Sequence, residues 1–406
     1  MPDRENKLEK LLLLWLLVRP ALDGWREVVI FSYHNTAINL NAALSIVIVL
    51  WSVVMLIKHR QSMTRAPGIV IASLLLLFAI LSIGWSVQPG ATLSEAIKLF
   101  IALSLFALAY SFAKERIIEP TSLAGAIALS ALIPIIVAIY QALTGAGLTT
   151  FDIHGRIYGT LGHPNVFAFL LLALIILALQ FPVAEKKYIL PLLGVLLLLT
   201  YTRAAVVGLA IFLTILGLAQ NKKLFKRIAL GIALTLVLLI GLTQMWPRET
   251  GALLARTPII SRFTTTNEDA DSLAWRQTLV LETIPLIHAR PLLGYGWGTF
   301  DKVWSDNRSQ AHFWDDSAQA HNDYLRLALE LGLVGLAVYI AFLATLIIKS
   351  FSLARQNPRH YLHLFAWIVT FTIVSLSDNM LHHTPILWLT FAYWGSAFGG
   401  ADRHEA

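Results

Sequence analysis

The sequence predicts an all-α polytopic membrane protein with about 12 transmembrane helices. Its composition supports this fold class, because 57% of the 406 residues are hydrophobic and only 14% are charged. A soluble protein of this length has about a quarter charged residues. Apolar runs of about 20 residues, long enough to cross a bilayer, also recur along the chain, among them 41–57, 68–82, 164–181 and 228–242.

The positions of the spans follow from these apolar runs. The first run is interrupted by Arg19 and Pro20. No small-residue cleavage site follows Leu11–Val18, so we interpret this stretch as part of the first span and not as a signal peptide. The expected spans are 9–31, 36–57, 68–86, 93–112, 121–143, 164–183, 188–202, 204–220, 227–246, 325–348, 362–378 and 384–400.

Basic residues predict the orientation of these spans. Most of the lysines and arginines fall in short segments that lie on one side of the predicted bundle. Short loops rich in Lys and Arg stay in the cytoplasm, so both termini are expected there. The net charge of +7 is then a consequence of topology, and nucleic acid is not an expected partner.

The chain is expected to divide into three parts, with helices one to nine in 1–246, a long outer loop in 247–324, and helices ten to twelve in 325–406. Proline and glycine punctuate the loop, which is too long for a simple connector. It is predicted to fold as a small unit with helices near 251–263 and 270–289. The absence of cysteine excludes disulfides, thiol catalysis and metal sites that need Cys.

Three arginines near the outer surface are candidates for binding an anion. Arg203 has no acidic residue near it in sequence; it could snorkel to the lipid headgroups or bind a phosphate bidentately. Arg276 could instead form a surface ion pair with Asp271 or Glu282. Arg156 lies in "HGRIYGTLGHPN", whose glycines and proline predict a shaped turn.

His321 stands with Asn322 and Asp323 at the polar start of a long apolar helix. Three interpretations are open: a packed interfacial histidine or helix cap, a metal ligand near His312, or a general base. A pKa near neutrality would suit removal of a hydroxyl proton. The start of the helix also offers free backbone N–H groups to an anionic substrate.

Four further polar residues lie at the outer ends of spans. His163 and Asn165 precede or begin the sixth span, where capping of the helix is the expected role. His382 and His383 lie at the start of the twelfth span, where they could share a site with His321 or belong to the interfacial belt.

Four segments together resemble the O-antigen ligase / O-antigen polymerase superfamily of bacterial envelope glycosyltransferases. They are "GRIYGTLGHPNVFAFLLLALI" (155–175), "LTYTRAAVVGLAIF" (199–212), "WRQTLVLETIPLIHARPLLGYGWGTF" (275–300) and "QAHNDYLRLALELGLVGLAVYI" (319–340). Their order and the long outer loop before the tenth span also fit. The resemblance covers most of 120–350.

The resemblance implies a fold similar to lipid-carrier-dependent (GT-C-like) glycosyltransferases, in the bacterial inner membrane with a periplasmic active site. The implied reaction is that of an O-antigen ligase, which transfers a glycan from undecaprenyl diphosphate to a sugar hydroxyl of the lipid A–core oligosaccharide. It would need no metal or other cofactor and would invert the anomeric carbon. By motif match, Arg203 and Arg276 would bind the diphosphate and His321 would be the catalytic base.

Several alternatives stay open. Arg156, Tyr201, Asn322 and Asp323 are possible pocket residues, and Asp323 or another carboxylate could orient His321. An O-antigen or other surface-polysaccharide polymerase is the second enzymatic interpretation. A transporter would place polar residues in a line through the bilayer, whereas here charges gather at the outer face. The main exception inside a span is Lys98, which could snorkel.

Overall fold

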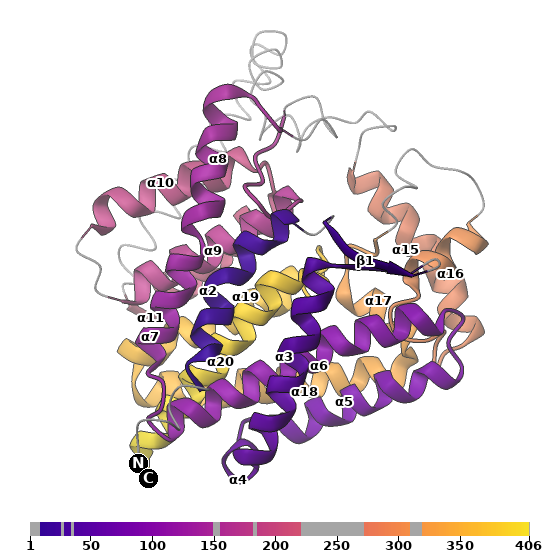
Figure 1. Ribbon diagram of the computed structural model, residues 1–406, viewed down its shortest axis with the longest axis horizontal. Coiled ribbons are helices and arrows are strands. Elements are labelled where there is room, and N and C mark those ends of the chain that lie inside the picture. The colour runs from indigo at the N-terminus through magenta and orange to yellow at the C-terminus, as the bar shows by residue number, and fades with distance from the viewer. Residues whose placement is uncertain are drawn as a thin grey trace.

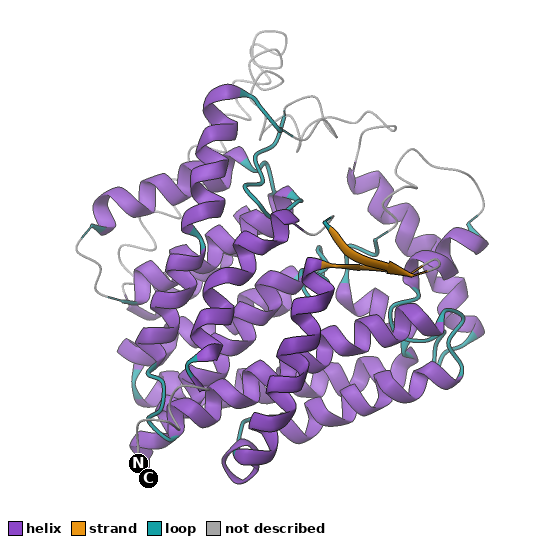
Figure 2. Cartoon of the chain, viewed as in Figure 1, coloured by secondary structure: helices purple, strands orange, loops and turns teal. Residues whose placement is uncertain are grey.

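The computed structural model describes residues 9–25, 28–33, 36–148, 155–181, 185–220, 272–308 and 319–405. These residues form a bundle of helices and one two-stranded hairpin (Figures 1 and 2). Among them, five segments are long and apolar enough to cross a membrane, which confirms a helical membrane protein. They are α3 (Leu40–Lys58), α6 (Pro89–Lys114), α7 with α8 (Pro120–Ser130 and Leu132–Thr144), α11 (Arg203–Gln220) and α18 (Gly332–Gln356).

The remaining helices are shorter or less apolar than these five segments. The longer ones are α2 (Leu11–Leu22), α5 (Ile69–Leu81), α9 (Pro164–Gln180), α10 (Lys186–Leu199), α15 (Ser272–Ala289), α19 (Pro358–Val374) and α20 (Thr384–Glu405). The short ones are η1 (Asp23–Trp25), α4 (Arg60–Met63), η2 (Ser82–Gly84), α16 (Phe300–Asn307) and α17 (Asp323–Glu330). Helix α15 confirms the helix expected near 270–289. The expected span 227–246 and the helix near 251–263 lie outside the described residues.

The prediction of a first span over 9–31 was wrong. Helix α2 ends at Leu22, and the chain then forms an antiparallel hairpin from β1 (Val29–Tyr33) and β2 (Thr36–Asn39). The apolar run after Gly24 reads "VVIFSY", and β-branched and aromatic residues of this kind favour a strand over a helix. The chain is therefore mostly helical, with this hairpin as an exception to the all-α prediction.

The expected span 121–143 is broken in two by Pro134. Helix α7 ends at Ser130 and α8 begins at Leu132. Pro134 has no N–H, so the carbonyl of Ser130 has no intrahelical donor four residues on. The apolar stretch remains long enough to cross a membrane.

The centre of the bundle is the close packing of α6 against α20. A Cβ on Gly395 would lie 2.0 Å from the carbonyl oxygen of Phe106, and one on Gly399 would lie 2.0 Å from that of Tyr110. Two glycines four residues apart thus let the two helix backbones meet, as small residues do in membrane helix pairs.

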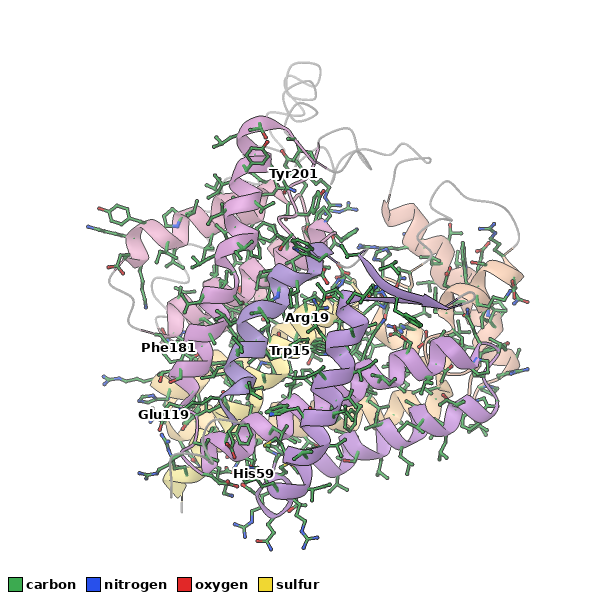
Figure 3. All side chains as sticks on the ribbon, in the orientation of Figure 1. Trp15, Arg19, His59, Glu119, Phe181 and Tyr201 are labelled. Carbon is green, nitrogen blue, oxygen red and sulfur yellow. The ribbon has the colours of Figure 1, made fainter. Side chains whose placement is uncertain are left out.

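The ends of the bundle agree with the predicted alternation of loops. Tyr201, in the turn between α10 and α11, lies at one end, whereas His59 and Glu119 lie at the opposite end (Figure 3). The basic segments at 58–65 and 114–116 therefore lie away from the turn that precedes Arg203. Which end of the bundle faces the cytoplasm stays a prediction.

Candidate functional site

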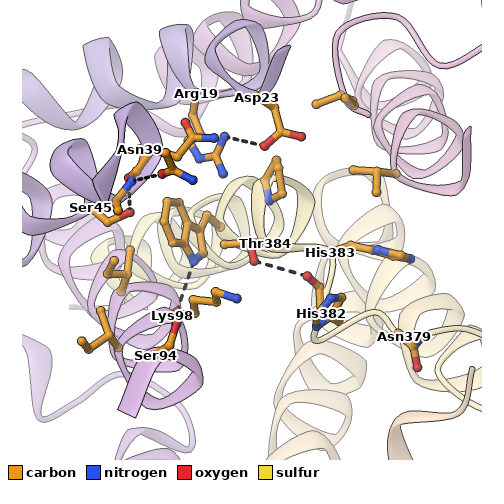
Figure 4. Close-up of a pocket in the computed structure, with 18 of the residues that line it drawn as sticks. Arg19, Asp23, Asn39, Ser45, Ser94, Lys98, Asn379, His382, His383 and Thr384 are labelled. Atoms are coloured by element: carbon orange, nitrogen blue, oxygen red, sulfur yellow. Dashed lines mark hydrogen bonds and ion pairs between the residues drawn. The ribbon is translucent and has the colours of Figure 1, made fainter. Parts of the chain in front are cut away.

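A pocket of about 880 Å³ opens between α2, α3, α6 and α20 (Figure 4). Many of its polar residues lie at or just before the starts of α9, α17 and α20: His163, Asn165, Gln319, His321, Asn379, His382, His383 and Thr384. Further polar residues come from α2, η1 and the start of α3: Arg19, Asp23, Asn39, Asn41 and Ser45. Its apolar residues come mainly from α3 and α6 and include Ile46, Val49, Leu50, Leu93, Ile97 and Ile101. A cavity lined by both polar and apolar residues suits an amphiphilic ligand.

His321 lines this pocket and does not cap the following helix. The side chain of Asn322 is the cap of α17, because it accepts hydrogen bonds of 3.0 Å from the backbone N–H groups of both Tyr324 and Leu325. His321 itself adopts a φ of 46°, a left-handed conformation that is uncommon for a residue with a side chain and that clusters at functional sites. The cap hypothesis for His321 is therefore wrong.

Asp378 is the carboxylate that faces His321. Its Oδ1 lies 4.0 Å from Nδ1 of His321 and 3.0 Å from Nε2 of His383. The carboxylate is fully buried, and it also accepts hydrogen bonds from Nδ2 of Asn165 at 2.9 Å and from the backbone N–H of Asn379 at 2.8 Å. Asp378 is thus held in place by three partners, with His321 just beyond hydrogen-bond distance.

Little in the sequence pointed to Asp378, because "SDN" between two predicted spans resembles any polar turn. It lies far from His321 along the chain. The segment between α19 and α20 brings the two together, because it is hydrogen-bonded to Asp323 at the start of α17 through the carbonyl of Ser375 and the N–H of Leu381. The doublet His382-His383 was the nearest signal. His383 does share the site of His321 through Asp378.

Burial keeps His321 neutral. Burial is the largest influence and lowers the pKa of His321 to about 4; the Asp378 carboxylate opposes this shift, and the positive charge of Arg276 adds to it. Burial alone would raise the pKa of Asp378, but the hydrogen bond from His383 and the nearby charges outweigh it and hold that pKa well below its usual range. At neutral pH the pair is therefore an imidazole beside a carboxylate.

The three arginines occupy different positions. Arg276, on α15, is close enough to His321 and Asp378 for its charge to act on both. Arg203 is half-buried at the first residue of α11. Tyr201, just before it, adopts a φ of 49° in the turn after α10. Neither Arg203 nor Arg276 is among the described residues that line the pocket.

Arg156 is buried in a hydrogen-bond network that supports the site. Its guanidinium donates to the carbonyl of Thr200 at 2.7 Å, to Oγ1 of Thr202 at 3.0 Å and to Oδ1 of Asn165 at 2.9 Å. Because Asn165 in turn donates to Asp378, Arg156 links the turn before α11 to the carboxylate beside His321. His163 caps α9 by accepting from the N–H of Asn165 at 3.1 Å, as the sequence predicted.

Asp323 lies behind the pocket wall. It is fully buried and accepts a hydrogen bond of 3.1 Å from the backbone N–H of Leu381. Burial raises the pKa of Asp323 to about 7, against the lowering effect of Arg326 and of this hydrogen bond. Asp378 and not Asp323 is therefore the carboxylate that faces the imidazole of His321.

The "PLLGYGWG" segment packs tightly on α17, and this packing explains its glycines. Glu330 accepts hydrogen bonds from the backbone N–H groups of Gly298 at 2.8 Å and Phe300 at 3.0 Å. Gly294 has a φ of 65°, and a Cβ there would lie 2.5 Å from the carbonyl of Glu330. The segment thus fixes α17, and with it His321, against α15 and α16.

In the part of the chain that the structure describes, no three histidine or carboxylate side chains are placed to hold one metal ion. His312, the neighbour considered in the sequence for a metal site with His321, lies outside the described residues.

Residues 188–340 match the family model described as O-antigen ligase. This segment belongs to the O-antigen ligase and polymerase superfamily. The match supports an activity of the O-antigen ligase or polymerase type. The match includes Arg203, Arg276 and His321, whereas Arg156, Asn165 and Asp378 lie outside it. A comparison with curated proteins gives no match.

Proposed function

We propose that this protein is an O-antigen ligase. It would transfer a glycan from undecaprenyl diphosphate to a sugar hydroxyl of the lipid A–core oligosaccharide at the periplasmic face of the inner membrane. The observation that carries the proposal is the group formed by His321, Asp378 and Arg276 beside a pocket lined by both polar and apolar residues. Such a pocket suits a donor that joins a charged headgroup to a hydrocarbon chain.

His321 is the proposed general base. As the acceptor hydroxyl oxygen forms a bond to the anomeric carbon, its proton passes to the imidazole. Nδ1 is the ring nitrogen nearest Asp378, which leaves Nε2 to take the proton. The Asp378 carboxylate then stabilises the imidazolium that forms. A positioned base of this kind contributes about 10²–10⁴-fold in rate.

Arg203 and Arg276 are the proposed partners of the leaving group. The bond between the anomeric carbon and the diphosphate oxygen breaks as the new bond forms, so negative charge develops on the diphosphate. Guanidinium groups match phosphate oxygens bidentately, and fixed cations aimed at developing charge stabilise the transition state. Direct displacement inverts the anomeric carbon.

The donor and the base are coupled through charge. A bound diphosphate adds negative charge near Arg276, which offsets the effect of that arginine on His321. The pKa of His321 is then expected to rise above about 4, nearer to the operating pH at which a base is most effective. His321 would thus become a stronger base once the donor is bound.

Product analysis with purified protein tests the proposal. Undecaprenyl-diphosphate-linked glycan and lipid A–core are incubated with the protein, with and without EDTA, and the products are separated by gel and mass spectrometry. Attachment of the glycan to lipid A–core that survives EDTA supports a metal-independent ligase. Longer lipid-linked glycans without attachment to lipid A–core would identify a polymerase, and loss of all transfer in EDTA would refute the metal-independent reaction.

A further inference from the structure

Lys98 is a charged residue within a helix that is apolar enough to cross a membrane. It is the tenth residue of α6, about 14 Å along the helix axis from Pro89 at about 1.5 Å per residue. An ionisable residue in such a segment is costly and usually marks a functional site. The proposed reaction assigns Lys98 no role.

Lys98 belongs to a buried charge network on the wall of the pocket. Its ammonium pairs with Oε1 of Glu95, while Oε2 of Glu95 accepts from Arg326 at 3.1 Å. Arg326 also pairs with Glu330 at 3.0 Å. Two carboxylates thus meet two cations, and the network is neutral as a whole.

Within this network, Lys98 is the member that lines the pocket. Its side chain is 39% exposed, against 12% for Glu95 and 5% for Arg326. An ammonium group has three N–H donors, and the pairing with Glu95 engages one side of it. The backbone beside it is fixed, because Nε1 of Trp388 donates to the carbonyl of Lys98 at 3.2 Å (Figure 4).

Both polar and apolar residues line the pocket together with Lys98. Ser94 of the same helix, His382 and Thr384 are among the polar ones. Ile97 and Ile101 of α6 and Ile46, Val49 and Leu50 of α3 are among the apolar ones. A ligand that contacts both sets would have a hydrocarbon chain along the apolar residues of α3 and α6 and a polar headgroup beside the histidine.

We propose that Lys98 binds the phosphate group of a lipid at the point where the headgroup joins the hydrocarbon chain, with the chain lying along α3 and α6. The ammonium group would donate hydrogen bonds to phosphate oxygens, which are charge-assisted and therefore strong. Two sources share this chemistry: the polyprenyl diphosphate of the proposed function, and a phospholipid of the bilayer. The polyprenyl diphosphate is a ligand only if the proposed function holds. Binding of a lipid phosphate by Lys98 does not depend on that function.

Binding to purified protein in detergent tests the proposal with three probes. They are undecaprenyl diphosphate, undecaprenol, which has the same chain without phosphate, and dioleoyl phosphatidic acid. Dissociation constants are measured by native mass spectrometry for the wild type, Lys98→Gln, Lys98→Arg and Glu95→Gln/Lys98→Gln. Lys302→Gln, an exposed lysine of α16, is the matched control.

We expect Lys98→Gln to weaken phosphate-lipid binding by about tenfold or more, as loss of a charged hydrogen bond does, and to leave undecaprenol binding unchanged. Unchanged undecaprenol binding also shows that the variant is folded. Lys98→Arg and Lys302→Gln should bind like the wild type. The double variant should still bind the phosphate lipids weakly, because it restores the neutrality of the network but not the N–H donors of Lys98.

Three outcomes would overturn the proposal. The first is equal binding of the phosphate lipids by Lys98→Gln and the wild type. The second is recovery of binding in the double variant, which would show that Lys98 only neutralises Glu95. The third is a loss of undecaprenol binding in Lys98→Gln as large as its loss of phosphate-lipid binding. Preference for undecaprenyl diphosphate over phosphatidic acid identifies the donor as the ligand, and the reverse preference identifies a bilayer phospholipid. If Lys98-dependent binding persists in a protein that transfers no glycan, the proposed function fails and this inference stands.

Discussion

Replacement of Asp378 by Asn removes the charge beside His321 with little change of shape. The two groups are 4.0 Å apart, and a carboxylate and an imidazolium at this distance attract by about 4 kcal/mol at an effective dielectric constant of about 20. Since about 1.4 kcal/mol corresponds to tenfold in rate, complete loss of this attraction would slow the reaction by about 10³-fold. Asp378 is also shared with His383, so we expect a decrease in kcat of about 10²–10³-fold.

The pH profile distinguishes this role from a structural one. The negative charge of Asp378 raises the pKa of His321, so its removal should lower that pKa below about 4. The acid limb of kcat/KM, where activity is lost as His321 becomes protonated, should then move to lower pH while kcat falls at every pH. The assay is single-turnover glycan transfer over a series of pH values.

Asp323→Asn is the matched control, since Asp323 is also a fully buried carboxylate near the start of α17. Its side chain bonds the backbone of Leu381, and burial raises its pKa to about 7, so the neutral amide resembles its protonated form. We expect little change in kcat or in the acid limb. A wild-type kcat in Asp378→Asn, or an equal loss in both variants, would refute the role assigned to Asp378.

Three further predictions concern the base, the cations and the loop. In the wild type, the acid limb of kcat/KM should lie nearer pH 4 than pH 6.5, because burial lowers the pKa of free His321 to about 4; a limb at 6.5 would show an exposed histidine. Arg276→Lys keeps the charge but loses bidentate geometry, so transfer should fall about tenfold or more, whereas Arg290→Lys on the segment after α15 should not affect it. Gly294→Ala should lower Tm through about 1–3 kcal/mol of backbone strain, because its φ is 65° and the new Cβ would meet Glu330; Gly125→Ala, with open space at its Cβ, should not lower it.

The sequence was sufficient for features that depend on local pattern. Apolar runs located most helices to within a few residues, for example α3 and α6, and the cap of α9 was predicted from "HPN". It was insufficient where strand and helix compete for the same apolar residues, as in "VVIFSY", which forms a hairpin. It was also insufficient at Pro134, which has no N–H to donate to the carbonyl of Ser130 and so divides one predicted span into α7 and α8.

The site required knowledge of packing. In "HNDYL", three consecutive polar residues were candidates for cap, base and orienting group, and only their backbone geometry assigns Asn322 as the cap and turns His321 to the pocket. The place of Asp378 beside His321 depends on a contact between the start of α17 and the segment that joins α19 to α20, which are far apart in sequence. Lys98 was noticed in the sequence as an exception, but its place beside Glu95 on the pocket wall is a consequence of how α6 packs against α17 and α20.

The most direct test of the proposed mechanism is the single-turnover rate of glycan transfer by His321→Ala. His288→Ala, an exposed histidine near the end of α15, is the control, and thermal unfolding of each variant checks the fold. We expect a decrease of about 10²–10⁴-fold for His321→Ala, as for loss of a positioned base, with no change for His288→Ala. A folded His321→Ala protein that transfers glycan at the wild-type rate would contradict the assignment of His321 as the base.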